Sequence, residues 1–460
     1  MGITKKLNPL DWTFLAAESR ESMMHVGALM LFEPAAAQHP EQLRTMMDEL
    51  REQAEAYPPW NLKLRYPERP AAPRQAWIED PDFDVEYHIR RSALPVPGDE
   101  RELGILVSRL HSHNIDFHRP PWEAHFIEGL SDGRFAIYLK VHHALVDGYT
   151  GIQLLSRSLS GNPDELDTPI FFARRPKPRA RGARSRTPPT LDALMQAVRE
   201  QYGATRNITR ALTTVLGRKD RALIAPMQAP KSVLNQRISR NRRFATQQFD
   251  VSRLKAVAAA RGGTLNDAVL MLCGSALRRY LIEQDELPLE PLTAMLPVNI
   301  RPKDDPGGGN AVGAILATLA TDVADPEQRF ETIVASTRSA KAQLQGMTRS
   351  AIMQYSALLM APLALSPIPG VAGRIRPAFN VVISNVPGPT QALYFRGNRM
   401  QAYYPLSIPF HGYALNITVV SYENTLNFGF IGCRDQVPHL QRLAVYSREA
   451  LETLESELDL

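Results

Sequence analysis

The chain of 460 residues is 44% hydrophobic and 22% charged, which excludes a disordered protein and leaves room for two domains. Lysine and arginine exceed aspartate and glutamate by five, 53 against 48. This small basic excess is weak evidence for nucleic-acid binding. It is equally compatible with an anionic membrane surface or a phosphate-bearing ligand.

Cysteine content and hydropathy indicate a protein of a reducing compartment that does not span a membrane. The two distant cysteines, Cys273 and Cys433, complete neither a zinc motif nor a disulfide framework, so we expect buried thiols. No apolar signal segment follows residues 1–6, which argues against secretion. The most apolar stretch, residues 351–372, is interrupted by three prolines and is not expected to cross a bilayer.

The first third of the chain mixes helix and strand patterns. Residues 41–56 place apolar side chains on one helical face, whereas residues 82–89 alternate polar and apolar side chains as a half-exposed strand does. We therefore expect helices over residues 9–15, 41–56 and 105–110, and strands over residues 24–32 and 82–89.

The sequence HHALVDG, residues 142–148, follows a predicted hairpin. Two apolar runs, residues 126–130 and 135–141, are joined by a Ser-Asp-Gly-Arg turn, and residues 151–155 begin a helical pattern. An imidazole at the end of a buried strand is held by a rigid element and can face a cleft. This stretch is therefore the main candidate for chemistry.

Polar side chains behind the helix at 105–110 have two interpretations. Histidines two residues apart with a nearby carboxylate can coordinate zinc or iron. The spacing completes no known metal motif, and exposed histidines after a helix are common. We favour the second interpretation and expect no metal site at His111, His113, Asp116 and His118.

The amino-acid composition of the chain changes between residues 162 and 190. Seven basic residues between positions 174 and 186 lie among proline, glycine and alanine, which is typical of an exposed linker. The alternative is that these residues contact anionic lipid. Residues 191–216 then form an amphipathic helical pattern, compatible with a membrane interface or with a helix that covers two domains.

The second half repeats a mixture of strands and helices. Thr264 and Asp267 are spaced as a capping box, so a helix cap is the simple interpretation of Asp267. The glycine-rich residues 306–310 lack the spacing and lysine of a phosphate-binding loop. We expect strands ending near residue 301 and over residues 244–249, 379–384, 412–421 and 426–431, and helices over residues 251–261, 264–281 and 440–458.

Five motifs are spread over most of the chain: MHVG (24–27), RPPWE (119–123), HHALVDG (142–148), TLND (264–267) and NVPGP (385–389). Together they resemble the motifs of the bacterial wax ester synthase/diacylglycerol acyltransferase family, with Pro121 where the family has Leu. This resemblance implies an α+β fold of two chloramphenicol-acetyltransferase-like domains, each a mixed sheet flanked by helices, with the active site in a tunnel between them. The expected division is residues 1–165, a basic linker and amphipathic helix over 166–240, and residues 241–460.

Transfer of an acyl group from a thioester to an alcohol needs a base, donors for the oxyanion and exclusion of water. The resemblance makes His143 the base, and we expect its neighbour His142 to support the motif. No GxSxG elbow is present, and neither cysteine lies beside a histidine in sequence, which favours direct attack over an acyl-enzyme.

The remaining site residues follow from the resemblance. Asp147 either orients the imidazole or, as we prefer, holds the loop by pairing with an arginine, for which Arg301 is the candidate. Gly148 is expected to adopt backbone torsions closed to other residues, and Asn266 to orient the substrate or share the oxyanion charge. The expected substrate tunnel includes His25, Trp122, Ser384 and Asn385.

The sequence therefore predicts an acyl-CoA-dependent O-acyltransferase that makes wax esters from fatty alcohols and triacylglycerol from diacylglycerol. No cofactor or metal is implied, acyl-CoA is a substrate, and no nucleic-acid partner is expected. We expect a cytoplasmic protein bound peripherally to the inner membrane or to lipid inclusions. Two alternatives are an acyltransferase of the same fold with another alcohol acceptor and a non-catalytic lipid-droplet-binding protein.

Overall fold

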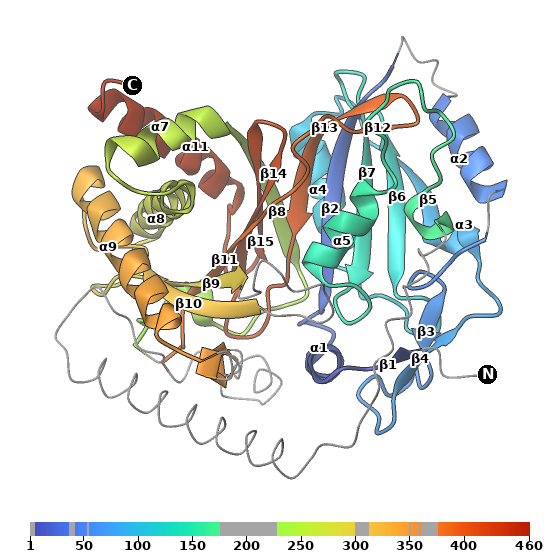
Figure 1. Cartoon of the computed structure of the whole chain (residues 1–460), viewed down its shortest axis with the longest axis horizontal. Helices are drawn as coiled ribbons and strands as arrows, with labels where there is room; N and C mark the ends of the chain where they lie inside the picture. The colour runs from blue at the N-terminus through green and yellow to red at the C-terminus, as the bar shows by residue number, and fades with distance from the viewer. Residues whose placement is uncertain are drawn as a thin grey trace. The chain divides into compact units, whose positions relative to one another are not determined.

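The computed structural model shows a mixed α+β chain in two compact units, each built from several segments. The first unit takes residues 1–176, 237–252 and 385–445, and the second takes residues 177–236, 253–384 and 446–460. Figure 1 traces the elements in chain order. The structure describes residues 5–35, 42–52, 55–174, 228–299, 312–348 and 376–460, and residues 351–359 except 353 and 357.

A six-stranded sheet in the order β12-β13-β2-β7-β6-β5 forms the centre of the first unit. All neighbours are antiparallel except β5 and β6, which are parallel. In Figure 1, β2, β7 and β6 lie side by side. The strands are β2 (His25–Glu33), β5 (Ile89–Ala93), β6 (Trp122–Glu128), β7 (Phe135–His142), β12 (Tyr394–Phe395) and β13 (Asn398–Leu406).

A second antiparallel ladder of the first unit joins β14 (Leu415–Tyr422), β15 (Thr425–Cys433) and β8 (Arg242–Asp250). One apolar cluster combines side chains of β2, β13 and β15 with those of helix α4 (Glu100–His111). The cluster holds the central sheet, the ladder and this helix together. Burial of a large aliphatic side chain contributes about 1.5–3 kcal/mol relative to exposure.

Shorter elements surround this core. Asn8 caps α1 (Pro9–Ala17), because its side chain accepts a hydrogen bond from the Asp11 N–H at 2.7 Å and Pro9 occupies the first turn. The other small elements of the first unit are α2 (Gln42–Glu52), α3 (Val85–His88), α5 (Gly148–Ser156) and the three-stranded sheet β1 (Lys5–Lys6), β4 (Ala76–Glu79) and β3 (Leu62–Leu64).

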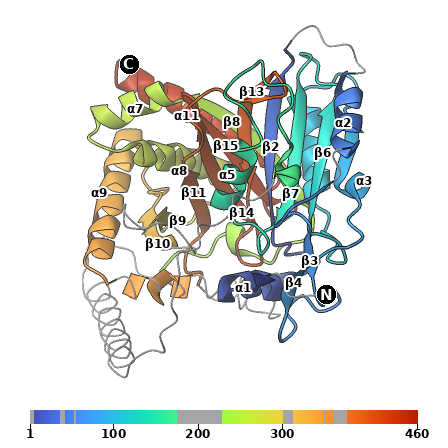
Figure 2. The same ribbon diagram turned by 45° about the vertical axis from the view of Figure 1, so that its right-hand side comes forward.

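The second unit packs helices against a short sheet, as Figure 2 also shows. Strand β9 pairs antiparallel with β10 and parallel with β11. Helix α8 carries a run of buried residues and packs against α9, which in turn packs against β10. The elements are α7 (Val251–Ala260), α8 (Leu265–Glu283), β9 (Thr293–Asn299), β10 (Val312–Thr318), α9 (Pro326–Gln345), β11 (Val381–Val386) and α11 (Gln441–Glu457). Of these, α7 and α11 begin, and β11 ends, in segments of the first unit.

Most of the predicted elements that fall on described residues are confirmed, and one is wrong. Residues 82–89 do not form a strand: residues 85–88 are helical, because the Asp84 side chain accepts hydrogen bonds from the N–H groups of Glu86 and Tyr87 at 3.0 and 3.2 Å. The helix predicted over 191–216, the glycine-rich loop at 306–310 and nearly all of the basic segment at 174–186 lie outside the described residues. The predicted domain boundaries stay a prediction.

Candidate active site

The HHALVDG stretch forms a turn between the end of β7 and the start of α5. The backbone N–H of His142 donates to the Pro121 carbonyl, and that of His143 donates to the Met24 carbonyl, both at 2.9 Å. The turn is therefore attached on one side to the residue before β6 and on the other to the residue before β2. The position of both histidines is set by backbone hydrogen bonds of the central sheet and its extensions.

His143 has the environment of a neutral base. Its ring centroid lies 4.1 Å from that of Phe14 on α1, and burial lowers the pKa of the imidazole from 6.5 to about 4, although the nearby Asp147 acts in the opposite direction. The Nδ1 atom is buried and has no hydrogen-bond partner among the described residues. The residue as a whole is partly exposed, and no described residue hydrogen-bonds to its Nε2 atom.

Asp147 is the N-cap of α5. Its two carboxylate oxygens accept hydrogen bonds from Thr150, one from the backbone N–H at 2.8 Å and one from the hydroxyl at 2.9 Å. These are the contacts of a residue that holds the loop. Arg301 lies outside the described residues, so its pairing with Asp147 stays a prediction.

Gly148 does not have the backbone conformation that we expected. Its φ angle is not in the left-handed range, and a Cβ added to it would meet no atom within 4 Å. The prediction that Gly148 adopts torsions closed to other residues is therefore wrong. The residue is exposed at the first position of α5, where a missing side chain leaves the surface beside the helix start open.

His142 is enclosed and oriented by its neighbours. Its Nδ1 atom accepts a hydrogen bond from the Ala144 N–H at 3.2 Å, so the proton of the neutral ring is on Nε2. That nitrogen lies 3.5 Å from the Glu18 carboxylate, and the Phe117 ring meets the imidazole edge-on with centroids 5.1 Å apart. Sequence reasoning missed Glu18, since a single glutamate after a short helix carries no recognisable signal.

His25 lies directly opposite His142 in the register of β2 and β7. Its Nε2 atom donates to the His111 carbonyl at 3.0 Å, and burial holds its pKa well below the usual value. The ammonium group of Lys140, itself 1% exposed, donates to the carbonyls of Leu110 and His113. His25 is thus a neutral, hydrogen-bonded core residue behind the turn, and its place in a substrate tunnel stays a prediction.

Trp122 has no exposed surface. Its indole N–H donates to the Trp60 carbonyl at 2.7 Å, and its ring packs against those of Trp60, His88 and Phe171. These are the contacts of an aromatic core that supports the start of β6. A contact between Trp122 and substrate stays a prediction.

The predicted site residues of the second half are half-buried. Asn266 occupies the first turn of α8 in the second unit, and Ser384 and Asn385 lie on β11. Asp267 is a helix cap, as expected: its carboxylate accepts from the Thr264 N–H at 2.8 Å and from the Thr337 hydroxyl at 2.7 Å. The approach of Asn266, Ser384 and Asn385 to the reacting groups stays a prediction.

The polar residues behind α4 have separate structural partners. His111 bonds to the Tyr138 hydroxyl at 2.7 Å, His113 donates to the Arg109 carbonyl, and His118 lies between Asp116 and Glu68. In the part of the chain that the structure describes, no group of three or more His, Cys, Asp or Glu side chains is arranged to hold a metal ion. Likewise, no described helix has both the length and the apolar character needed to cross a bilayer.

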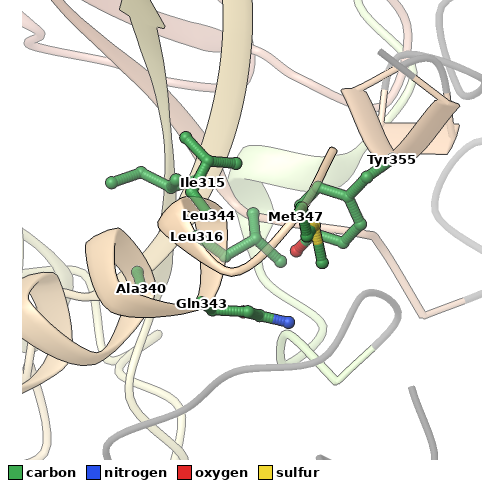
Figure 3. Close-up of a pocket in the computed structure, with 7 residues that line it drawn as sticks. All are labelled: Ile315, Leu316, Ala340, Gln343, Leu344, Met347 and Tyr355. Atoms are coloured by element: carbon green, nitrogen blue, oxygen red, sulfur yellow. The ribbon is translucent and has the colours of Figure 1, made fainter. Parts of the chain in front are cut away.

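A small pocket in the second unit lies beside the end of α9 (Figure 3). It shares no residue with the predicted site. Its lining is mainly apolar and consists of Ile315, Leu316, Ala340, Gln343, Leu344, Met347 and Tyr355.

Comparison with solved structures defines the class of fold. The starter condensation domain of rhizomide synthetase is 14% identical and superposes with a TM-score of 0.55 over 99% of this chain and 95% of that one. At this identity the likeness concerns the fold alone. The wax ester synthase/diacylglycerol acyltransferase of Marinobacter aquaeolei VT8 is much closer, with 38% identity and a TM-score of 0.78 over 99% of this chain and 100% of that one.

Comparison with sequences gives the family. The wax ester synthase/diacylglycerol acyltransferase catalytic domain matches residues 7–269, and the C-terminal domain of the same family matches residues 308–455. A Mycobacterium tuberculosis protein provisionally named a diacylglycerol O-acyltransferase is 51% identical over 98% of this chain and 97% of its own length. The O-acyltransferase WSD of Acinetobacter baylyi is 38% identical, with 98% and 97% covered. The chain belongs to the wax ester synthase/diacylglycerol acyltransferase family, and it is an acyltransferase.

Proposed function

We propose that the chain transfers a fatty acyl group from acyl-CoA to the hydroxyl of a long-chain alcohol or of diacylglycerol, with His143 as the general base. The observation that carries this proposal is the state of His143: the residue is partly exposed, burial lowers its pKa to about 4, and no described residue hydrogen-bonds to its Nε2 atom. The names of the relatives support the choice of substrates and of the products, wax ester and triacylglycerol.

In this mechanism the Nε2 atom of His143 removes the hydroxyl proton while the oxygen attacks the thioester carbonyl. The tetrahedral oxyanion collapses, the carbon–sulfur bond breaks, and the CoA thiolate takes the proton back from the imidazolium. A low pKa keeps the imidazole unprotonated at neutral pH. It also makes the imidazolium a stronger acid, which favours transfer of its proton to the CoA thiolate. The proposal requires no cofactor.

The test is His143→Ala assayed for release of free CoA with palmitoyl-CoA and hexadecanol, and again with diacylglycerol. We expect a loss of about 10²–10⁴-fold in kcat, the usual contribution of a positioned base. His118→Ala is the matched control, since His118 is exposed and bonds to Glu68 and Asp116 instead. Retained turnover in His143→Ala would refute the mechanism. Release of CoA without dependence on an acceptor would exclude transfer to an alcohol.

We also propose that the enzyme is cytoplasmic and binds peripherally to a membrane or lipid-inclusion surface. Its proposed substrates and products partition into such surfaces, and seven basic residues lie between positions 174 and 186 of the sequence. Each basic residue near an anionic surface contributes about 1 kcal/mol of attraction. Flotation with vesicles of anionic phospholipid tests this: deletion of residues 174–186 is expected to weaken binding, and unchanged binding would remove the role of this segment.

A further inference from the structure

We propose that Glu18 is a positioning residue for the acyl transfer reaction, acting on His143 through the backbone of the turn that carries it. This inference rests on the proposed function, in which His143 is the base. Glu18 follows directly after α1, and its side chain is only 10% exposed. None of the motifs in the sequence includes it.

Glu18 acts on the two sides of the catalytic turn. On one side, its Oε2 atom accepts the Met24 N–H at 2.5 Å, and the carbonyl of the same Met24 accepts the His143 N–H at 2.9 Å. On the other side, the same oxygen lies 3.5 Å from the Nε2 atom of His142, whose Nδ1 atom accepts the Ala144 N–H. The residues before and after His143 are thereby connected to one carboxylate.

The carboxylate is the group that these surroundings require. Its neighbours all present donors: the Met24 N–H, the Nε2–H of His142 and the Asn114 amide, which donates to Oε1 at 3.1 Å. A carboxylate has acceptor capacity at both oxygens, whereas an amide has one oxygen and adds two N–H donors. Glutamine has almost the same volume, but its amide N–H groups would face the N–H donors that surround Glu18. At least one buried polar group would then have no hydrogen-bond partner.

A shift of the turn moves the imidazole relative to the hydroxyl and the thioester carbon. A misplacement of about 1 Å can reduce turnover by about 10²-fold without any change in the reacting groups. We therefore expect Glu18→Gln to lower kcat by about 10–100-fold while the KM values for palmitoyl-CoA and hexadecanol change by less than about threefold. Glu18→Asp keeps both acceptor oxygens, so it is expected to retain more of kcat than Glu18→Gln.

A double-mutant cycle tests whether the effect passes through the turn. If Glu18 acts through His142, the change Glu18→Gln costs clearly less kcat in a His142→Ala background than in the wild-type enzyme. Glu21→Gln is the matched control from the same connecting segment, because that carboxylate is 44% exposed and faces Arg237 and His411. The control is expected to keep wild-type kinetics.

Each outcome decides a different point. The positioning role would be overturned by a wild-type kcat in Glu18→Gln, or by equal losses of kcat in Glu18→Asp and Glu18→Gln. In either case an inactive His143→Ala variant would still support the proposed function. An equal loss in both backgrounds would overturn the part of the proposal that passes through His142. Retained turnover in His143→Ala would remove the proposed function itself. Circular-dichroism melting curves show whether each variant folds. If Glu18→Gln does not fold, Glu18→Asp replaces it in the cycle, and a smaller loss of kcat in the His142→Ala background is again the expected result.

Discussion

Asp147 has two interpretations that one isosteric substitution separates. Asparagine keeps an oxygen for the Thr150 N–H and offers an N–H to the Thr150 hydroxyl, so the cap survives. We expect Asp147→Asn to keep kcat within about threefold of the wild type. Asp147→Ala removes the cap and is expected to cost about 1 kcal/mol of stability, together with activity.

The measurement is kcat with palmitoyl-CoA and hexadecanol, alongside urea unfolding of both variants. Thr150→Val is the control, because it removes the hydroxyl partner and leaves the Asp147 bond to the backbone N–H intact. A large loss of kcat in Asp147→Asn with unchanged stability would contradict the loop-holding role. It would favour an aspartate that orients the imidazole.

The sequence motif led to His143, Asp147 and Gly148, but their states depend on contacts that no motif contains. The low pKa of His143 results from burial, and one of the rings packed against it, that of Phe14, is distant in the sequence. Gly148 was expected to need special torsions, but it lies at the exposed start of a helix, where an added Cβ would meet no atom within 4 Å. Glu18 could not be found because its donors come from three separate segments.

At the scale of elements, β15 and β13 approach each other at a position where no side chain fits. A Cβ on Gly429 would lie 1.8 Å from the Pro405 carbonyl oxygen, which is backbone and cannot rotate away. Gly429→Ala is therefore expected to lower the free energy of unfolding by about 1–3 kcal/mol, the usual cost of overpacking. Thermal melting of the purified variant measures this cost.

Gly161→Ala is the matched control for this prediction. A Cβ at Gly161 meets no atom within 4 Å, and its φ angle is not in the left-handed range, so this change is expected to leave the melting temperature almost unchanged. Equal melting temperatures for Gly429→Ala and the wild type would mean that the two strands can separate at little cost.

The elements that were predicted from the sequence are those formed by interactions between residues close together in the chain. The hairpin of β14 and β15 and the helix α8 have local patterns and were predicted. Residues 82–89 alternate as a strand does, yet Asp84 caps a helical turn there, so a local hydrogen bond prevailed over the pattern. Strand β13 pairs with β2, which lies near the other end of the chain, and Arg399 is opposite Glu33. The local sequence around β13 does not indicate which strand it pairs with.

At the scale of the whole molecule, the two-domain α+β class was predictable because motifs of one family are spread over most of the chain. The assignment of segments to units was not, because residues 237–252 and 385–445 return to the unit that contains the N-terminal segment. Such a return depends on strand pairing between distant segments, as in the ladder of β8 and β15.

Buried neutral histidines in the first unit give the molecule a predictable sensitivity to acid. Burial lowers the pKa of His88 and of His411 to about 4 and holds that of His25 and His111 well below 6.5. In the unfolded chain a histidine titrates near 6.5. Between about pH 6.5 and 4 the unfolded chain therefore binds protons that the folded chain excludes, and stability falls as the pH falls.

His88 shows the size of the effect. Its ring is stacked between Phe83 and Trp122, and its Nδ1 atom donates to the Trp122 carbonyl at 2.7 Å. A folded pKa of about 4 costs roughly 3 kcal/mol of stability between pH 6.5 and 4 for this one residue. Urea unfolding at pH 7.5, 6.5 and 5.5 is thus expected to show a midpoint that is nearly constant above pH 6.5 and falls below it.

Two variants attribute the fall in stability to histidine. His88→Phe removes one titrating group of similar shape, so its stability is expected to decline less steeply between pH 6.5 and 5.5, by up to about 1.4 kcal/mol per pH unit. Phe83→Leu perturbs the same stack without a titrating group and is expected to lower stability at every pH while leaving the slope unchanged. A wild-type midpoint that does not move from pH 7.5 to 5.5 would show that these histidines accept protons in the folded state.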